Sequence, residues 1–275
     1  MPNHLLKTID ILPSVSSFVL ARRKDTGGFA ATPRLPATIE DTYHAVNIFG
    51  LIDKFYRHCT VTPDYYPKED GALLRYFSIP FHSLPDDPKT VFRFLKCLRI
   101  IGLDIDDDAI LSYVSAQLNT PFSLQRWYYL ARILNEVLDA GSAFVGIVSK
   151  GPRYFTWRTV DEARMGLYLA RIGCGIELDE IKMAQWLKDC QNEDGGFGFL
   201  PQTTSYIENC HFCLDTLLSL GVAPKDADAA FDFIMGCHTA VGGFARNGMA
   251  APFLDATWHA VASLSLIASS RWLSK

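Results

Sequence analysis

A short turn, Gly-Gly-Phe, occurs three times in this 275-residue chain and constrains its fold more than any other feature. The copies begin at Gly27, Gly195 and Gly242. In the middle copy the turn joins two apolar-periodic runs within residues 186–222, and the second run ends at Gly221. Apolar residues at this spacing predict amphipathic helices, and a glycine directly after such a run is typical of a helix end. The turn therefore belongs to a repeated helix–turn–helix unit.

Other segments extend the repeat along the chain. Three of them start at a glycine, continue through acidic residues and enter an amphipathic helix: 102–117, 175–191 and 221–237. Acidic side chains are favourable in the first turn of a helix, so these segments predict helix starts. The second helices of three degenerate copies, which lack the glycine turn, are predicted at 88–102, 123–138 and 159–173. Residues 54–87, with several tyrosines and prolines, predict a loop-rich insertion.

The sequence thus predicts an all-α fold of about six helix pairs in a single domain. The approximate repeats are 10–53, 54–102, 103–138, 139–173, 175–221 and 222–272. One helix of each pair has a polar face and the other is apolar nearly all round, so the second set should be buried. A closed ring of inner helices surrounded by outer helices satisfies both patterns. The N-termini of the inner helices then converge on one mouth of the ring, where we expect the functional site.

Composition excludes several classes of protein. The net charge is −4 and no basic run is present, which argues against a nucleic-acid partner. No apolar stretch reaches about 18 residues, so we expect no membrane-spanning helix. The N-terminal residues lack the pattern of a secretory signal. Seven scattered cysteines, an odd number, favour reduced and buried thiols, and we therefore expect a cytoplasmic protein.

The Gly-Gly-Phe turn, the short loop after it and the aromatic-rich second helix resemble the repeat of protein prenyltransferase β subunits. That family shares an α/α toroid with squalene- and terpene-cyclase domains. The resemblance covers most of the chain and is weakest over residues 54–87. It implies an isoprenoid diphosphate held in an apolar barrel, with its prenyl group transferred to a zinc-activated acceptor. It also implies a possible partner, a separate helical-repeat α subunit that is absent from this chain.

The resemblance implies a zinc site. In the family, an Asp-x-Cys pair after one glycine turn and a histidine of the last repeat bind the metal. Glu208 and Cys210 fall at the positions of that pair, and His259 falls near the histidine. A carboxylate, a thiolate and an imidazole leave a fourth tetrahedral position for an incoming sulfur, and zinc would lower the pKa of the Cys210 thiol.

The residues alone allow a second interpretation of the same positions. An acidic residue follows each Gly-Gly-Phe turn at the same spacing, so Glu208 also fits a shared role at a helix start. Cys210 takes the place of Thr42 and Thr257 in the other two complete copies. Cys210 and Cys213 form a lone CxxC pair, and we expect Cys213 to belong to the core.

Further positions resemble cavity residues of the family. Arg164 follows Glu-Ala, where the family has a histidine that touches the diphosphate, and Arg126 with Tyr129 resembles an Arg-x-x-Tyr that faces the cavity. These two arginines are the predicted catalytic cations. The predicted substrate contacts are Trp258, Tyr129, Tyr168, His211 and Arg246. The loop 198–207 contains no Arg or Lys, although the family places cations there, so arginines from elsewhere would have to stabilise the leaving diphosphate.

Two other functions stay open. Asp104-Ile105-Asp106-Asp107 resembles the DxDD acid of class II terpene cyclases, which implies an isoprenoid cyclase using Asp106 to protonate an alkene. The same residues also fit an acidic helix start, because the repeat aligns them with residues 176–179. A non-catalytic member of the fold, which binds a lipid or a partner chain, would lack both the zinc and a cationic cluster at the mouth.

Overall fold

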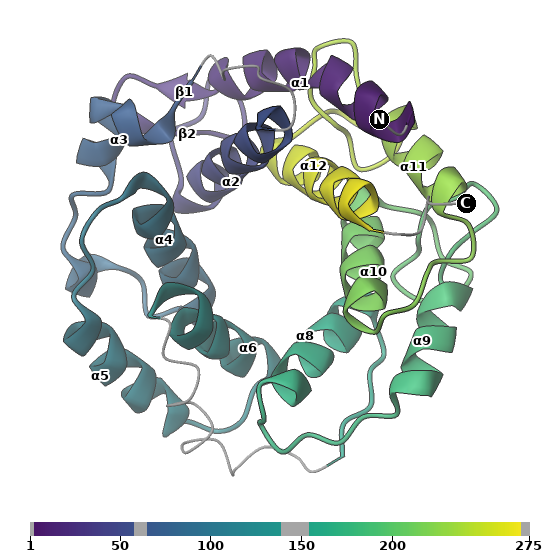
Figure 1. Ribbon diagram of the computed structural model, residues 1–275. Helices are drawn as coiled ribbons and strands as arrows, with labels where there is room; N and C mark the ends of the chain where they lie inside the picture. The colour runs from purple at the N-terminus through teal and green to yellow at the C-terminus, as the bar shows by residue number, and fades with distance from the viewer. Residues whose placement is uncertain (1–2, 58–64, 139–153, 271–275) are drawn as a thin grey trace.

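The computed structural model describes residues 3–57, 65–138 and 154–270, and within these residues six helices form an inner ring (Figure 1). They are α2 Ile39–Tyr56, α4 Pro88–Ile101, α6 Leu124–Arg132, α8 Val160–Arg171, α10 Ile207–Ser219 and α12 Leu254–Ser269. Each inner helix contacts the next one along the chain, and α12 contacts both α10 and α2. The ring is therefore closed by its last helix packing against its first.

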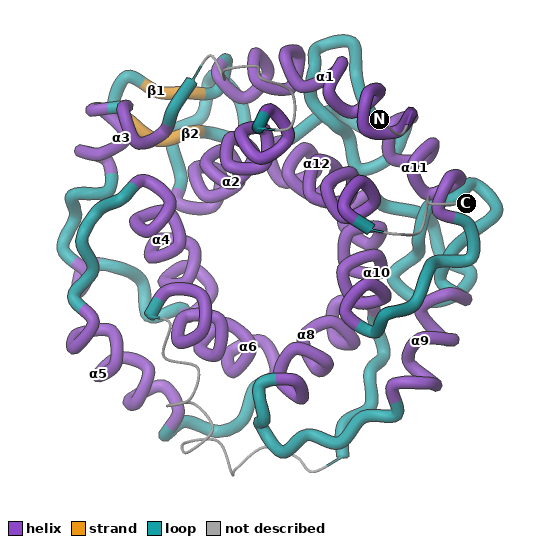
Figure 2. Tube along the Cα trace, viewed as in Figure 1, coloured by secondary structure: helices purple, strands orange, loops and turns teal. Residues whose placement is uncertain are grey.

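The outer layer surrounds this ring and is joined to it by loops (Figure 2). Its helices are α1 Asn3–Leu20, α3 Gly71–Tyr76, α5 Asp107–Leu118, α9 Glu180–Asp189 and α11 Ala227–Gly236. Two short antiparallel strands, β1 Arg23–Lys24 and β2 Gly27–Phe29, form the first glycine turn. The remaining elements are the single turns η1 Pro67–Glu69 and η2 Phe81–Ser83, and a π-helical turn η3 Ile133–Val137 that continues α6.

The predicted α/α toroid is confirmed. The expected loop-rich insertion at 54–87 contains the short helix α3, and α2 continues to Tyr56, beyond the predicted repeat boundary. The division into six repeats stays a prediction, because the first part of the fourth repeat, residues 139–153, lies outside the described residues. Among the helices that are described, none combines the length and the apolar character needed to cross a membrane.

Aspartates start the three outer helices that the acidic segments predicted. Asp106, Asp179 and Asp226 are the N-cap residues of α5, α9 and α11. Each carboxylate accepts a backbone N–H three residues further along, at 2.8–3.0 Å. These bonds satisfy N–H groups that have no partner inside the helix.

The first glycine of each Gly-Gly-Phe turn docks one repeat onto the next outer helix. Gly27, Gly195 and Gly242 have φ angles of 99°, 84° and 92°, which side-chain-bearing residues rarely adopt. A Cβ atom on any of them would lie within 2.1–2.2 Å of a backbone oxygen. Those oxygens belong to Ala72 in α3, Ala229 in α11 and Ser14 in α1. The turn therefore requires glycine for contact as well as for conformation, and the third contact joins the last repeat to the first.

Candidate functional site

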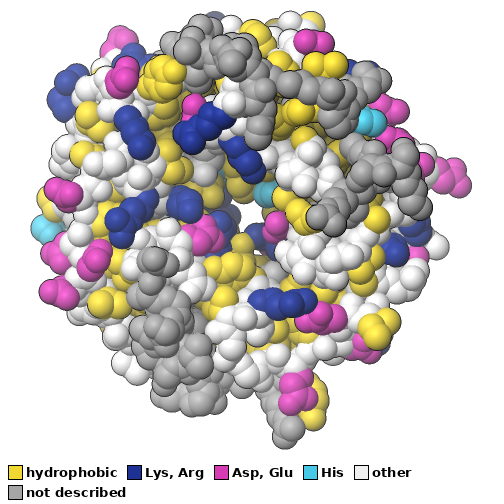
Figure 3. Space-filling view, in the orientation of Figure 1, with side chains coloured by type: hydrophobic (Ala, Val, Ile, Leu, Met, Phe, Trp, Pro, Cys, Tyr) yellow, Lys and Arg dark blue, Asp and Glu magenta, His cyan; other side chains and the backbone are white. Residues whose placement is uncertain are grey.

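A cavity of about 110 Å³, the mouth cavity, opens where the inner helices meet near the N-termini of α4, α6 and α8. All six inner helices contribute to its wall. Lys89, Gln125 and Asp161 are each the second residue of their helix, so the N-terminal, positive ends of these helix dipoles lie at the cavity. In the space-filling view, basic side chains gather around the hollow at the centre of the ring (Figure 3). Both features favour a negatively charged ligand.

Four basic residues from α4, α6 and α8, the cationic arc, line the mouth cavity: Lys89, Arg93, Arg132 and Arg164. The side chains of the three arginines are only 12–17% exposed. Each arginine has a carboxylate partner at 2.5–2.7 Å, namely Glu40, Glu136 and Asp161 respectively. Lys89 forms no ion pair with any residue that the structure describes. The arc therefore combines three neutralised cations with one charge available to a ligand.

Arg164 is held in place by several neighbouring side chains. Its guanidinium donates a hydrogen bond to the hydroxyl of Tyr128 and lies over the rings of Tyr128 and Phe212, 4.8 and 4.5 Å from their centroids. Burial lowers the pKa of Arg164, but the interactions with Tyr128 and Asp161 outweigh burial and raise it. The side chain is thus a permanent positive charge fixed between aromatic rings.

Aromatic side chains from α2, α4 and α12, the aromatic wall, form another part of the cavity: Tyr43, Phe92 and Trp258. The Trp258 indole stacks on the imidazole of His44, with centroids 5.4 Å apart and planes 24° apart. Tyr43 contacts both Trp258 and Phe92 edge-on. The mouth cavity therefore offers an apolar surface beside its cations.

Two histidines meet in the ring next to Trp258. The Nδ1 atoms of His211 and His259 are 2.9 Å apart, so one ring donates a hydrogen bond to the other. Burial lowers the pKa of His211 to about 3 and lowers the pKa of His259 well below its usual value, and Arg164 adds to both shifts. Burial likewise lowers the pKa of His44 to about 3. All three imidazoles are neutral at pH 7.

The three expected zinc ligands are engaged elsewhere. Glu208 accepts a hydrogen bond from Arg246 Nε at 2.8 Å and forms an ion pair with the same guanidinium. Cys210 is fully buried, and burial raises the pKa of its thiol, which keeps it protonated. His259 is bonded to His211. Within the described residues, no group of three or more His, Cys, Asp and Glu side chains is placed to hold a metal ion. This arrangement does not fit the expected zinc site.

Cys210 instead occupies the position of a turn-binding threonine. In the first and last complete repeats, the hydroxyls of Thr42 and Thr257 accept the N–H of Phe29 and Phe244, at 2.9 and 3.0 Å. The Cys210 thiol receives the corresponding hydrogen bond from the backbone of Phe197. The three positions therefore share one structural role, which is to accept the backbone N–H of the phenylalanine in the glycine turn.

Replacing Cys210 with threonine is expected to change the free energy of unfolding by less than about 1 kcal/mol, because a hydroxyl can accept the same N–H. Cys210→Val, which has the shape of threonine without its oxygen, should cost about 1–3 kcal/mol by leaving the buried Phe197 amide without a partner. Urea denaturation of both variants measures the difference. Equal stabilities for the two variants would contradict the turn-binding role.

The other predicted residues are divided among several places. Arg164, Tyr129 and Trp258 line the mouth cavity, and His211 lies against its Trp258. Tyr168 lines a neighbouring cavity. Arg126 does not line the mouth cavity, and its guanidinium donates to the hydroxyl of Thr120 at 2.5 Å. Arg246 does not line it either: this residue is exposed and bound to Glu208, with its guanidinium 4.6 Å from the ring centroid of Tyr206.

Sequence reasoning missed several cavity residues: Tyr43, His44, Lys89, Phe92, Arg93, Gln125, Arg132 and Asp161. His44 had a signal, since Tyr43-His44 in the first repeat corresponds to Trp258-His259 in the last. Lys89, Arg93 and Arg132 lie in degenerate repeats without a glycine turn, where the register of the inner helix cannot be read by alignment with a complete copy.

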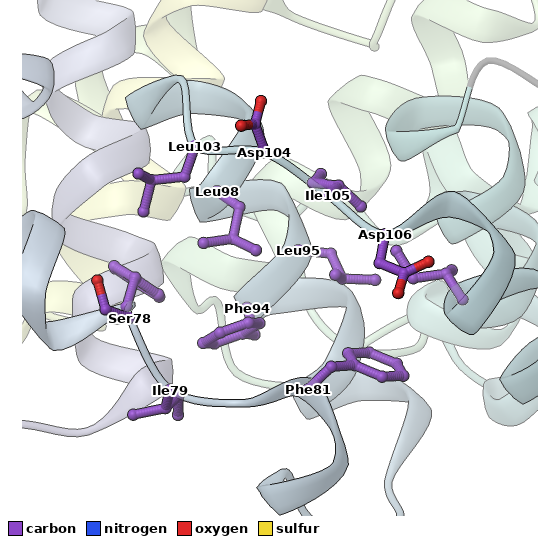
Figure 4. A pocket seen from close by; sticks show the side chains of 12 residues that line it. Ser78, Ile79, Phe81, Phe94, Leu95, Leu98, Leu103, Asp104, Ile105 and Asp106 are labelled. Carbon is purple, nitrogen blue, oxygen red and sulfur yellow. The ribbon is translucent and has the colours of Figure 1, made fainter.

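The residues of the DxDD-like motif lie outside the ring. Asp104 and Asp106 are exposed at the edge of a largely apolar pocket of about 380 Å³, formed by α4 and the chain segments outside it (Figure 4). Asp106 caps the outer helix α5 through the N–H of Ala109. A cyclase acid must face the interior of the ring, so the alternative function based on Asp106 is wrong. The motif is a helix start.

A family model described as the prenyltransferase alpha-alpha toroid domain matches residues 5–77 and 167–274, about two thirds of the chain. The chain belongs to this family. No curated protein matches the chain. The matched segments contain α2, α10 and α12, which supply Tyr43, His44, Phe212, Trp258 and His259 to the mouth cavity. Helices α4 and α6, which supply Lys89, Arg93 and Arg132, lie between the two matched segments.

Proposed function

We propose that this chain binds an isoprenoid diphosphate in the mouth cavity and transfers its prenyl group to an acceptor. The observation that carries the proposal is the meeting of the cationic arc and the aromatic wall in one cavity. Lys89, Arg93 and Arg164 suit the diphosphate, because guanidinium and ammonium groups bind phosphate oxygens by charge-assisted hydrogen bonds. Tyr43 and Trp258 offer an apolar surface to the prenyl chain.

The same surroundings suit the chemistry of prenyl transfer. When the bond between C1 of the prenyl group and the diphosphate oxygen breaks, negative charge grows on the leaving group and positive charge on the allyl carbons. Fixed cations such as Arg164 stabilise the first charge, and aromatic faces such as Trp258 stabilise the second. Because Arg93 and Arg164 already have carboxylate partners, the diphosphate has to share them with Glu40 and Asp161.

The size of the mouth cavity favours a short prenyl group. Its volume of about 110 Å³ is below the roughly 300 Å³ at which sites for drug-sized ligands begin. Dimethylallyl diphosphate, with a single isoprene unit, is therefore the first ligand to test. Longer isoprenoid diphosphates would require side chains of the aromatic wall to move.

Calorimetric titration with dimethylallyl diphosphate tests the proposal. We expect saturable binding that inorganic diphosphate inhibits competitively, followed by release of diphosphate when an acceptor is present. Absence of binding at millimolar ligand would contradict the proposal. An assay of the isolated chain also tests whether a separate helical subunit is required for turnover.

A second candidate is a non-catalytic member of the family that binds an isoprenoid lipid. The observation in its favour is the state of Cys210, a fully buried thiol whose pKa is raised by burial. Binding of dimethylallyl diphosphate without release of diphosphate would favour this candidate. Elemental analysis of the protein, purified without chelator, tests the predicted zinc independently, and about one zinc per chain, lost on Cys210→Ala, would restore the zinc-assisted acceptor.

A further inference from the structure

A second cavity of about 120 Å³, the inner cavity, lies between α6, α8 and α10. Arg164 and side chains of α6 line both this cavity and the mouth cavity, so the two are neighbours at Arg164. Arg171 and Ser219, which are the last residues of α8 and α10, also line the inner cavity. The inner cavity therefore extends toward the end of the ring opposite the mouth.

Asp215 is the acidic side chain of the inner cavity. It is half-buried on α10, and no side chain in the described part of the protein donates a hydrogen bond to it or forms an ion pair with it. The two arginines of the cavity, Arg164 and Arg171, have their own carboxylate partners in Asp161 and Glu180. A partly buried carboxylate without a hydrogen-bond or ion-pair partner loses hydration, and the charges of Arg164 and Arg132 offset that loss only in part, so it favours a ligand that donates a hydrogen bond.

The remaining polar groups of the inner cavity are hydroxyls. They belong to Tyr128, Tyr168, Thr216 and Ser219. The hydroxyls of Tyr128 and Tyr168 accept from Arg164 and Asn135 and keep their own protons to donate. The Thr216 hydroxyl donates to the carbonyl of Phe212 and can still accept, so this lining suits a ligand that both donates and accepts. A volume of about 120 Å³ equals roughly four water molecules at their share of liquid volume. The cavity thus fits a small neutral alcohol better than an ion or a long chain.

We propose that Asp215 is the general base for the prenyl acceptor, and that this acceptor is a small hydroxyl-bearing molecule entering from the end of the ring opposite the diphosphate. The inference rests on the proposed function, because it needs the prenyl donor in the mouth cavity. Donor and acceptor then meet beside Arg164. Burial also raises the pKa of Asp215, although Arg164 and Arg132 oppose this, and a carboxyl with a higher pKa accepts a proton more readily.

The transfer step involves three changes at the meeting point. The acceptor oxygen uses a lone pair to form a bond to C1 of the prenyl group. The bond between C1 and the diphosphate oxygen breaks, and its electron pair leaves with the diphosphate toward the cationic arc. The hydroxyl proton of the acceptor moves to the Asp215 carboxylate. The products are a prenyl ether and inorganic diphosphate; with water as acceptor, the product is the prenyl alcohol.

Asp215→Asn tests the inference, because asparagine keeps the shape and removes the base. With dimethylallyl diphosphate as donor and ethanol or water as acceptor, we expect ether and alcohol formation to fall at least about 100-fold, the usual lower range for a general base. The dissociation constant of the donor, measured by calorimetry, should stay within about twofold. Asp108→Asn, an exposed aspartate in the first turn of outer helix α5, is the matched control and should change neither quantity.

A second variant tests the route of the acceptor without touching the base. Ser219 is exposed at the end of α10, so Ser219→Trp is expected to fold and to obstruct the inner cavity. Product formation should fall while donor affinity is kept. Full activity of Asp215→Asn, or binding of the donor by the unaltered protein without any product, would overturn the inference and leave donor binding intact. Failure of the unaltered protein to bind dimethylallyl diphosphate would instead overturn the proposed function, and the inference with it.

Discussion

Arg164→Gln is expected to weaken the binding of dimethylallyl diphosphate at least about 100-fold. Arg164 lines both cavities and is held in place by Tyr128 and Phe212, so it presents its charge to a ligand in a fixed position. Truncating one partner of a buried charge pair typically costs about 2–5 kcal/mol, and about 2.7 kcal/mol corresponds to 100-fold in affinity. Calorimetric titration of the variant measures the loss.

Arg158→Gln is the matched control for this experiment. Arg158 also pairs with a carboxylate near the start of α8, but its side chain is 87% exposed and it does not line the mouth cavity. Its replacement should change donor affinity less than twofold, because exposed ion pairs contribute little. Arg164→Lys should recover part of the affinity by keeping the charge. Unchanged binding by Arg164→Gln would show that the diphosphate does not lie at the cationic arc.

Gly195→Ala is expected to lower the free energy of unfolding by about 2–5 kcal/mol. A left-handed backbone costs an alanine about 1–2 kcal/mol, and forcing a methyl group into a filled contact adds about 1–3 kcal/mol. Here the added Cβ would lie 2.1 Å from the backbone oxygen of Ala229, which a rotamer change cannot move. Urea denaturation followed by circular dichroism measures the effect.

Gly221→Ala separates the two causes. Gly221 has a φ angle of 71°, and nothing lies within 4 Å of a Cβ atom placed on it. Its replacement should therefore cost only the backbone strain, about 1–2 kcal/mol. If Gly195→Ala and Gly221→Ala were equally destabilised, the contact with α11 would contribute nothing, and the turn would require glycine for its conformation alone.

The fold could be read from the sequence because each of its main features has a local signal. Apolar periodicity marks the helices, Asp106 and its counterparts mark helix starts, and three glycines mark the turns. The sequence also indicated that α2 and α12 are equivalent helices, since Tyr43-His44 and Trp258-His259 occupy the same place in two repeats. Aligning the repeats therefore related positions in α2 and α12 that lie far apart in the sequence.

The candidate site was less accessible because its contacts join helices from different repeats. Arg93 and Arg132 belong to degenerate copies, so no aligned turn places them on the inner side of the ring. The pairing of Glu208 with Arg246 depends on how two loops meet, which no local pattern specifies. For Cys210 the sequence offered two interpretations, and the structure favours the one suggested by Thr42 and Thr257 over the one suggested by family resemblance.

The contact between the third glycine turn and α1 has a consequence for how the molecule folds. The hydroxyl of Ser14 and Nε2 of His238 are 3.2 Å apart although 224 residues separate them along the chain. Bringing such distant segments together carries a large loop-closure entropy, so we expect the contact between α1 and the third glycine turn to form late in folding. In an open helical-repeat array each unit contacts only its neighbours, so the loss of a terminal repeat exposes a single interface. Here the final repeat is also the neighbour of the first, and removing it would expose α2 and α10 together.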